Sequence, residues 1–121
     1  MIGYVTLGTN DLKRAIAFYE AVLAPLGVKR VHESDHSMAW GTGSGAGLSV
    51  TRPFDQKPAT AGNGTMIAIA VDKPATVDAL YRKAIELGGR DEGAPGERFK
   101  GFYAAYFRDL DGNKLACFHM G

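Results

Sequence analysis

The first quarter of the chain places a β-prone run directly before apolar residues at helical spacing. Residues 2–9, "IGYVTLGT", are β-branched and aromatic with small residues between them, which predicts a strand. Asn10 or Asp11 can cap a following helix, because a short side-chain oxygen accepts from the free amides of the first turn. Pro25 and Gly27 are expected to end this helix. Its apolar positions lie three and four residues apart and predict one buried face: Leu12, Ala15, Ile16, Tyr19, Val22, Leu23 and Leu26.

Three short strands are predicted after this helix, because clusters of serine, aspartate and glycine separate β-prone runs. We expect them around Val28–Glu33, Ser37–Gly41 and Leu48–Arg52. Residues 53–64, "PFDQKPATAGNG", are rich in proline, glycine and alanine and predict a connector.

The same order of elements then restarts. "TMIAIAV" predicts a strand, Pro74 suits the first turn of a helix, and Gly88 and Gly89 end it. The apolar face of this helix is expected to comprise Val77, Leu80, Tyr81, Ala84 and Ile85. Further strands are predicted near 90–92, at 101–107 and at 113–119.

The two halves of the chain therefore look like copies of one β-α-β-β-β unit. Residues 4–27 and 66–89, offset by 62 positions (66 − 4), align strand, helix and closing glycine. Neither unit can bury both faces of its sheet alone, so we expect the two to pair into a half-open barrel with a cavity. The prediction is an α+β fold in one domain over 1–121, made of repeat 1 (1–52), a connector (53–64) and repeat 2 (65–119).

The stretch "FRDLDGNKLACF", residues 107–118, admits two interpretations. Asp109 and Asp111 beside Gly112 resemble the start of a calcium loop, but calcium needs about six to eight oxygen ligands and the following residues supply no further acid. Gly112 and Asn113 instead suit the positive-φ positions of a tight turn. We therefore predict a hairpin turn.

Composition narrows the class of protein. Apolar residues make up 45% and charged residues 22% of the chain, and the formal net charge is +1, so neither nucleic acid nor an anionic membrane is an expected partner. The longest apolar run, residues 66–71, is far shorter than the ~20 residues of a spanning helix. The N-terminus lacks a basic region typical of a signal peptide, and the single cysteine fits a reducing compartment. We expect a cytoplasmic protein.

Three stretches give the chain a family resemblance: "DLKRAIAFYEAVLAPLG", "MIAIAVD" and "FRDLDGNKLACF". With the internal repeat, they resemble the vicinal oxygen chelate superfamily, which includes glyoxalase I, the bleomycin- and fosfomycin-resistance proteins and extradiol dioxygenases. The last stretch usually reads D-P-D-G-N in the family, so Leu110 departs from the pattern. The resemblance covers nearly the whole chain and implies the paired, half-open barrel.

The resemblance also identifies four metal-ligand positions, and this chain fills them with unsuitable residues. They fall on Tyr4, on Ser49 or Thr51, on Met66 and on Ala116, where metal-dependent members carry histidine or glutamate. Tyrosine and serine are poor ligands for a divalent ion, methionine favours soft ions and alanine cannot bind one. We expect no metal and no other cofactor.

Other stretches of the sequence do not provide a replacement metal site, a dinucleotide-binding loop or a nucleophile as their preferred interpretation. His32 and His36 fall in a predicted strand and turn, where we expect them to be exposed rather than metal ligands. His119 is out of phase with Ala116 and should point away from the cavity. "GTGSGAG" precedes no helix and predicts a flexible hairpin rather than a dinucleotide loop. Cys117 has no basic partner and is expected to pack as a small hydrophobic side chain.

Strand alternation then gives a draft of the cavity face. Tyr106 falls where fosfomycin-resistance relatives use an inward tyrosine. For each candidate the sequence allows two roles, packing within a collapsed core or contact with a ligand. The candidates are Tyr4, Thr6, Ser49, Thr51, Met66, Tyr106, Ala116 and Phe118.

Three functions are consistent with this face. The first is metal-free binding of a small, partly aromatic or apolar molecule, as in bleomycin-resistance relatives. The second is a lactoylglutathione-lyase-like or other enzyme of the family that uses Tyr4 or Tyr106 as acid or base. The third is a ligand-free dimerisation or interaction module. A phenol with an ordinary pKa near 10 is a poor base at neutral pH, which favours binding over catalysis. The resemblance further implies a homodimer.

Overall fold

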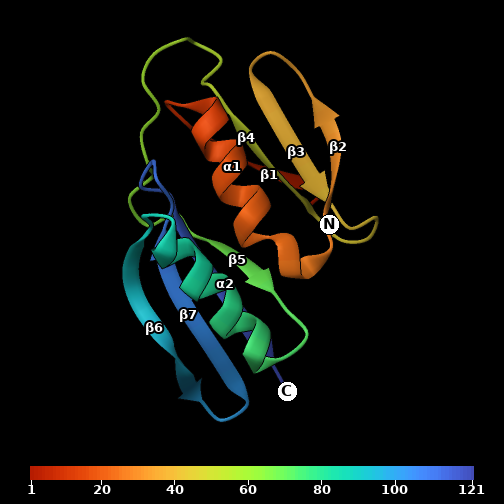
Figure 1. The fold of residues 1–121 in the computed structure, drawn as a ribbon, viewed down its shortest axis with the longest axis vertical. Coiled ribbons are helices and arrows are strands. Elements are labelled where there is room, and N and C mark those ends of the chain that lie inside the picture. Colours follow the sequence, from red (N-terminus) through yellow and green to blue (C-terminus); the bar gives the residue numbers. More distant parts are fainter. The chain divides into compact units, whose positions relative to one another are not determined.

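The computed structural model describes all of residues 1–121, which form two compact units, Met1–Thr60 and Ala61–Gly121 (Figure 1). Each unit contains a strand, a helix and three further strands in that order. In each, the four strands make one mixed sheet, and the first strand of the unit runs parallel to the last. The predicted α+β class, built from two βαβββ repeats, is confirmed. Neither helix is long and apolar enough to cross a membrane.

The first unit has the sheet order β1-β4-β3-β2, and all pairs except β1 with β4 are antiparallel. A short 3-10 helix, η1, follows its α-helix. The elements are β1 (Tyr4–Gly8), α1 (Leu12–Val22), η1 (Ala24–Leu26), β2 (Lys29–Glu33), β3 (Ser37–Gly41) and β4 (Gly47–Thr51).

Helix α1 begins as the sequence predicts and ends earlier. The Asp11 side chain accepts a hydrogen bond from the amide of Arg14 at 3.1 Å and so caps the first turn. The α-helix ends at Val22, although apolar spacing continues to Leu26. Pro25 explains the difference, because it lacks the amide that a further α-helical hydrogen bond needs and disfavours helical geometry in the residue before it.

The core of the first unit lies between α1 and one face of its sheet. Tyr19 on the helix and Trp40 on β3 bring their ring centroids to 5.9 Å, and both side chains are almost fully buried. The remaining buried positions follow the predicted periodicity of helix and strands. The hydrophobic ones are Leu7, Ala15, Phe18, Val22, Leu23, Met38, Leu48 and Val50.

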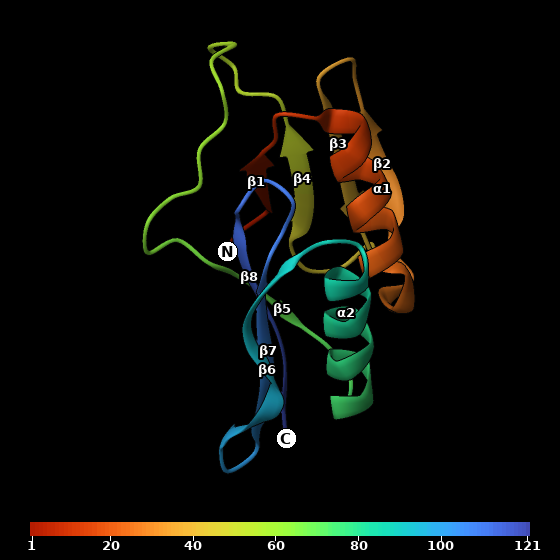
Figure 2. The ribbon, with the colours of Figure 1, turned by 60° about the vertical axis from the view of Figure 1, so that its left-hand side comes forward.

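The second unit repeats this plan with the sheet order β5-β8-β7-β6, and α2 covers one face of the sheet (Figure 2). Its elements are β5 (Ile67–Ala70), α2 (Pro74–Glu86), β6 (Arg90–Phe99), β7 (Phe102–Arg108) and β8 (Lys114–Met120). Pro74 opens α2 as predicted. Cys117 is buried beneath the helix, with its sulfur 3.7 Å from the Val77 carbonyl, and burial raises its pKa to about 11. It packs as a small hydrophobic side chain, as expected.

Strand β6 is much longer than the sequence predicted near residues 90–92. It continues to Phe99 along β7, with irregularities of register on both sides of Gly93 and again after Glu97. These irregularities break the two-residue alternation that identifies a strand. Pro95 also argues against a strand by composition, but β6 lies at the edge of the sheet, where a missing amide is tolerated.

Residues 109–113 form the predicted turn between β7 and β8. The Asp109 carboxylate accepts from the amides of Asp111 and Asn113, each at 2.9 Å, and from the Asn113 side chain at 2.9 Å. Gly112 has a φ of 89°, which a glycine adopts without strain. Asn113 does not have a positive φ, so that part of the prediction is wrong. Its side-chain amide instead binds back to Asp109 and closes the turn.

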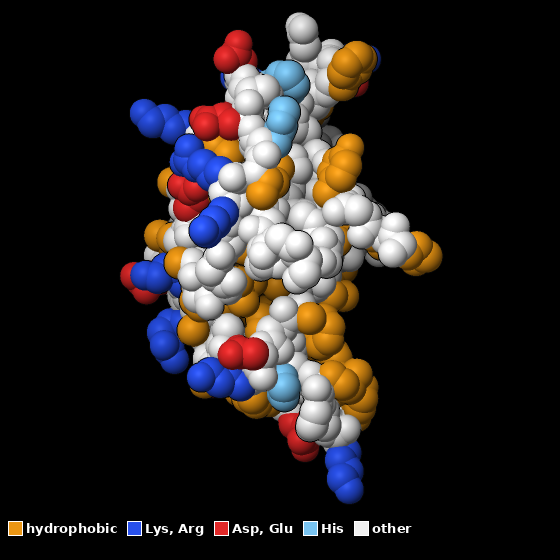
Figure 3. All heavy atoms as spheres, turned by 90° about the vertical axis from the view of Figure 1, so that its right-hand side faces the viewer, with side chains coloured by type: hydrophobic (Ala, Val, Ile, Leu, Met, Phe, Trp, Pro, Cys, Tyr) orange, Lys and Arg blue, Asp and Glu red, His pale blue; other side chains and the backbone are white.

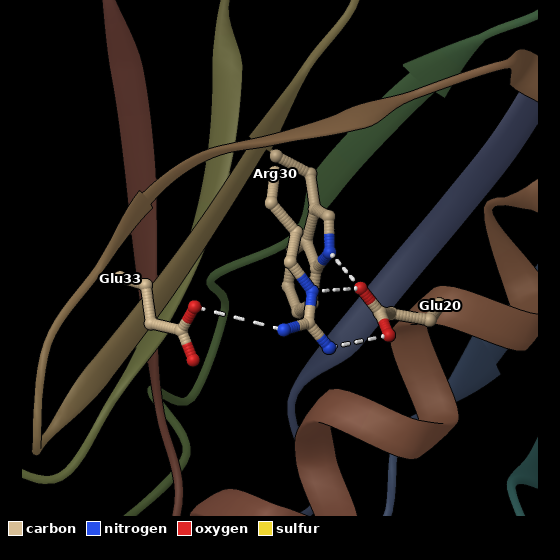
Figure 4. A network of polar contacts seen from close by, with 4 residues as sticks. Glu20, Arg30 and Glu33 are labelled. Atoms are coloured by element: carbon tan, nitrogen blue, oxygen red, sulfur yellow. Dashed lines mark hydrogen bonds and ion pairs between the residues drawn. The ribbon is translucent and has the colours of Figure 1, made fainter.

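A polar network joins α1 to the sheet of the first unit (Figure 4). Glu20 accepts from the guanidinium of Arg30 at 2.6 and 2.8 Å and from the indole nitrogen of Trp40 at 3.0 Å. These hydrogen bonds, led by that from Arg30, lower the pKa of Glu20 to about 2. The network ties the edge strand β2 to the helix and supplies the acceptor that the buried indole needs.

Replacing Glu20 should destabilise the fold by an amount that depends on whether an acceptor remains. Glu20→Ala leaves the indole N–H of Trp40 without a partner, which should lower the free energy of unfolding by about 1–3 kcal/mol. Glu20→Gln retains an acceptor oxygen and should cost less. Urea denaturation measures both. Glu33→Gln, which removes the exposed pair with Arg30 at 3.6 Å, is the control and should cost under about 1 kcal/mol. Equal losses in all three variants would contradict the role of the indole acceptor.

The same network predicts how acid affects stability. Because folding lowers the pKa of Glu20 from 4.5 to about 2, its contribution is present above pH 4.5 and is lost as the pH falls toward 2. The difference in melting temperature between the wild type and Glu20→Gln should therefore shrink between pH 6 and pH 2.5. Thermal denaturation followed by circular dichroism tests this. A difference that stays constant over this range would show that the ion pair adds no stability.

Candidate functional site

The face of the first sheet opposite α1 carries an open groove of about 650 Å³. Strand pairing places Thr6, Ser49, Ala39 and His32 in one row across the four strands. Three of these four side chains are small, and the neighbouring row contains Gly47 on β4 and Gly41 on β3. The groove is hollow because its floor consists of residues that do not fill the space above the sheet.

Hydroxyl groups line this floor, and several have no partner in the protein. The side chains of Tyr4, Thr6 and Ser49 make no hydrogen bond within the chain, although Ser49 is only 8% exposed. Thr51 differs, because its hydroxyl lies 3.0 Å from the His36 carbonyl. A polar side chain that is largely buried and opens only into a groove is normally satisfied by water or by a ligand.

The groove contains no permanently charged side chain. Its lining includes no lysine, arginine, aspartate or glutamate, and its titratable side chains are Tyr4 and His32. The β3–β4 hairpin, residues 42–46, contributes one wall through small and hydroxylated residues, as its sequence predicted for a connecting loop. This surface is suited to an uncharged molecule that offers both apolar area and hydrogen-bonding groups.

Four of the eight predicted cavity residues lie together in this groove: Tyr4, Thr6, Ser49 and Thr51. Sequence reasoning missed His32, Ser37 and Ala39. The register of β2 shifts between Arg30 and His32, so counting alternate residues along β2 gives the wrong face. Ser37 and Ala39 carried a usable signal, since they alternate with the buried Met38 and Trp40 on β3.

The other four predicted residues lie on the second unit. Tyr106 on β7 pairs in register with Ala116 on β8, on the face of the sheet opposite α2. Phe118 lies two residues further along and stacks on Phe102 with ring centroids 5.5 Å apart. Met66 immediately precedes β5 and is 42% exposed. Strand alternation thus places Tyr106, Ala116 and Phe118 on one face.

The residues at the family's metal-ligand positions do not fit a metal ion. Tyr4 and Ser49 offer only neutral hydroxyls, and Ala116 has no donor atom. No three side chains of histidine, cysteine, aspartate or glutamate gather anywhere in the chain in a way that could hold an ion. His32 and His36 are both exposed, as predicted. His119 is half-buried rather than a freely exposed side chain, because its Nδ1 lies 3.2 Å from the Val71 carbonyl.

Comparison with known proteins identifies relatives over the full length of this fold. A glyoxalase/bleomycin resistance protein from Albidiferax ferrireducens T118 is 34% identical, covers 100% of this chain and 99% of its own, and superposes with a TM-score of 0.93. A glyoxalase/bleomycin resistance protein/dioxygenase family enzyme from Burkholderia phytofirmans PsJN is 23% identical, with 98% of both chains covered and a TM-score of 0.78.

A third solved structure shares the fold at lower similarity. The lactoylglutathione lyase from Agrobacterium tumefaciens is 23% identical and covers 98% of this chain and 92% of its own, with a TM-score of 0.71. None of the curated proteins matches the chain. A sequence model described as glyoxalase/bleomycin resistance protein/dioxygenase superfamily matches residues 1–117. With a match of that length and two βαβββ units in the expected order, the chain belongs to the glyoxalase/bleomycin resistance protein/dioxygenase superfamily, also called the vicinal oxygen chelate superfamily.

Proposed function

We propose that this protein binds a small, uncharged, partly aromatic or apolar molecule in the groove of the first unit, and that it does so without a metal. The observation that carries the proposal is the set of unpartnered hydroxyls on Tyr4, Thr6 and Ser49 around an otherwise small-residue floor. Unlike a collapsed core, this face leaves open space beside its hydroxyls, including that of the largely buried Ser49.

Binding would combine two contributions. The apolar part of the ligand would rest on Ala39 and against the ring of Tyr4, which is 73% exposed and therefore has apolar surface to bury. The hydroxyls of Thr6 and Ser49 would orient the polar part. An ionised ligand group would lose hydration here without gaining a countercharge, which favours an uncharged molecule.

A metal-free acid–base enzyme is the second candidate function, and His32 is the observation that favours it. His32 lies at the end of the Thr6–Ser49–Ala39 row and is a titratable side chain on the lining, where the sequence had offered only tyrosines. An imidazole nitrogen can accept a proton from a bound substrate, as a general base must. Turnover of a groove ligand that His32→Gln abolishes without weakening binding would favour catalysis over binding alone.

Filling the groove should abolish ligand binding. Ala39→Leu adds bulk to the floor and should weaken a ligand found by thermal-shift screening of small neutral aromatic and apolar metabolites by at least tenfold. Ala17→Leu makes the same change on the exposed side of α1 and should leave affinity unchanged. Ser49→Ala removes one hydrogen bond, worth about 1 kcal/mol, and should weaken binding about fivefold. Isothermal titration calorimetry measures all three.

Two outcomes would contradict this assignment of the groove. Hits whose affinity is the same in Ala39→Leu and Ala17→Leu would bind elsewhere. A screen that yields no ligand for the wild type would instead support a ligand-free interaction module. Thermal melting of each variant separates a lost site from a lost fold.

Metal content provides a separate test. Because the family's ligand positions hold Tyr4, Ser49 or Thr51, Met66 and Ala116, the purified protein should contain far less than one zinc, nickel, manganese or iron ion per chain. Elemental analysis by inductively coupled plasma mass spectrometry measures this directly. Ligand affinity should also be unchanged by EDTA. One tightly bound metal per chain, or lactoylglutathione turnover that a chelator abolishes, would refute metal-free function.

A further inference from the structure

The chain contains three asparagines, and the structure engages the side chains of two of them. Asn10 accepts from the Ala59 amide through Oδ1 at 2.7 Å and donates to the Ala59 carbonyl through Nδ2 at 3.2 Å. Asn113 is 8% exposed and donates to the Asp109 carboxylate at 2.9 Å. Asn63 differs, because it is exposed and its side chain makes no hydrogen bond within the chain. Its amide group is therefore free to rotate and to meet water.

Asn63 lies in a tight turn of the connector, which runs without helix or strand toward β5 (yellow-green in Figure 2). Every residue from 61 to 66 is exposed. The Thr65 amide donates to the Gly62 carbonyl at 3.2 Å and closes the turn. Gly64 has a φ of 91°, as the third position of a type II turn requires. A Cβ at Gly64 would meet no atom within 4 Å, so the peptide after Asn63 is uncrowded.

The residue that follows Asn63 makes this free side chain reactive. Asparagine is thermolabile, because the main-chain nitrogen of the next residue can attack Cγ of its side chain. Glycine favours the attack, since it has no Cβ to obstruct the approach and leaves the backbone free to rotate. The nitrogen of Gly64 makes no hydrogen bond within the chain. The attack requires the Asn63 backbone to rotate out of the turn, and only the hydrogen bond from Thr65 to Gly62 opposes this rotation.

The turn between β7 and β8 contains a comparable pair, Asp111 and Gly112, but holds it firmly. The Gly112 nitrogen donates to the Asp109 carbonyl at 3.1 Å, so the atom that would attack Asp111 is already engaged. The Asp109 carboxylate also accepts from the amides of Asp111 and Asn113, each at 2.9 Å. Rotation of this backbone would break several hydrogen bonds at once. The two turns therefore differ in how readily the same ring closure can occur.

We propose that Asn63 is a site of spontaneous modification, at which its side-chain amide is converted to a carboxylate through a cyclic imide formed with Gly64. The co-reactant is water, and the products are aspartate and isoaspartate at position 63. The site lies outside the groove of the first unit, and its reactivity does not depend on whether a ligand binds there.

The reaction balances without any oxidation or reduction. The Gly64 nitrogen loses its proton and forms a bond to Cγ of Asn63, while the bond from Cγ to Nδ2 breaks and ammonia leaves. Water then opens the five-membered imide at one of its two carbonyl carbons. Opening at the Cγ–nitrogen bond gives aspartate. Opening at the main-chain carbonyl gives isoaspartate, in which Cβ becomes part of the main chain.

The modification changes both charge and backbone length in the connector. One amide becomes a carboxylate, so the formal net charge falls from +1 to 0 (+1 − 1). Figure 3 shows basic and acidic side chains mixed on the face that it draws. On a protein with so small a net charge, one added carboxylate is a large relative change, which ion-exchange chromatography can resolve. The isoaspartate form also adds one carbon to the main chain of the 62–65 turn.

The test compares reaction in the folded and the unfolded chain. The full chain is incubated at 37 °C and pH 8, with and without guanidinium chloride, and followed by peptide mapping with mass spectrometry. The peptide containing Asn63 should become about 1 Da heavier, since an NH₂ group is replaced by OH. Folding should slow this change by at most about tenfold, because one hydrogen bond opposes it. Folding should slow isomerisation at Asp111 by more than about thirtyfold, because several hydrogen bonds must break.

Variants assign the change to Asn63 and Gly64. Asn63→Gln lengthens the side chain beyond five-ring closure and should abolish the mass increase at this site. Gly64→Ala places a Cβ beside the attacking nitrogen and should slow it. Asn10→Gln removes another asparagine and is the matched control, expected to react at Asn63 like the wild type. An Asn63 that stays intact in the folded chain while it reacts in denaturant would overturn the proposal, as would equal protection of Asn63 and Asp111 or an unchanged rate in Gly64→Ala. Circular dichroism verifies that each variant folds.

Discussion

A single helix can cover only one face of a four-stranded sheet, and this limit determines how the chain is organised. In the first unit α1 buries the side of the sheet that carries Met38, Trp40 and Val50, and in the second α2 buries Phe107, Leu115 and Cys117. Because strand residues alternate between faces, burying one set necessarily presents the other on the opposite side. The fold therefore places each strand side chain either against the helix or on the opposite face of the sheet.

The two repeats use their uncovered faces differently. The first carries alanine, serine, threonine and glycine, which leave a groove lined by free hydroxyls. The second carries phenylalanine rings and a tyrosine flanked by Arg98 and Lys114. Both faces are built on equivalent strands of the same topology. Their side chains differ: the groove of the first repeat has no charged lining residue, whereas the second repeat places Arg98 and Lys114 beside Tyr106.

Regular alternation made most of the fold predictable from sequence, and irregular backbone explains where prediction failed. The helices and most strands follow from apolar spacing together with caps such as Asp11 and Pro74. Four of the predicted residues lie together in one groove because β1 and β4 pair without interruption. The place of His32 on the groove lining and the length of β6 were not predicted, because register shifts interrupt the period of two. The role of Asn113 was missed because its side-chain hydrogen bond, rather than its φ angle, closes the turn.

The parallel pairing of β1 with β4 places the first strand of the unit beside the last, with the groove floor on one side and the core on the other. Neighbouring residues of β4, such as Ser49 and Val50, therefore face different surroundings although a single peptide bond joins them. A substitution at Ser49 or Thr6 would change the lining of the groove, whereas a substitution at Val50 or Leu7 would disturb the packing of the sheet on its helix. Substitutions at every second position of these strands can thus alter one face of the sheet while the packing against α1 is kept.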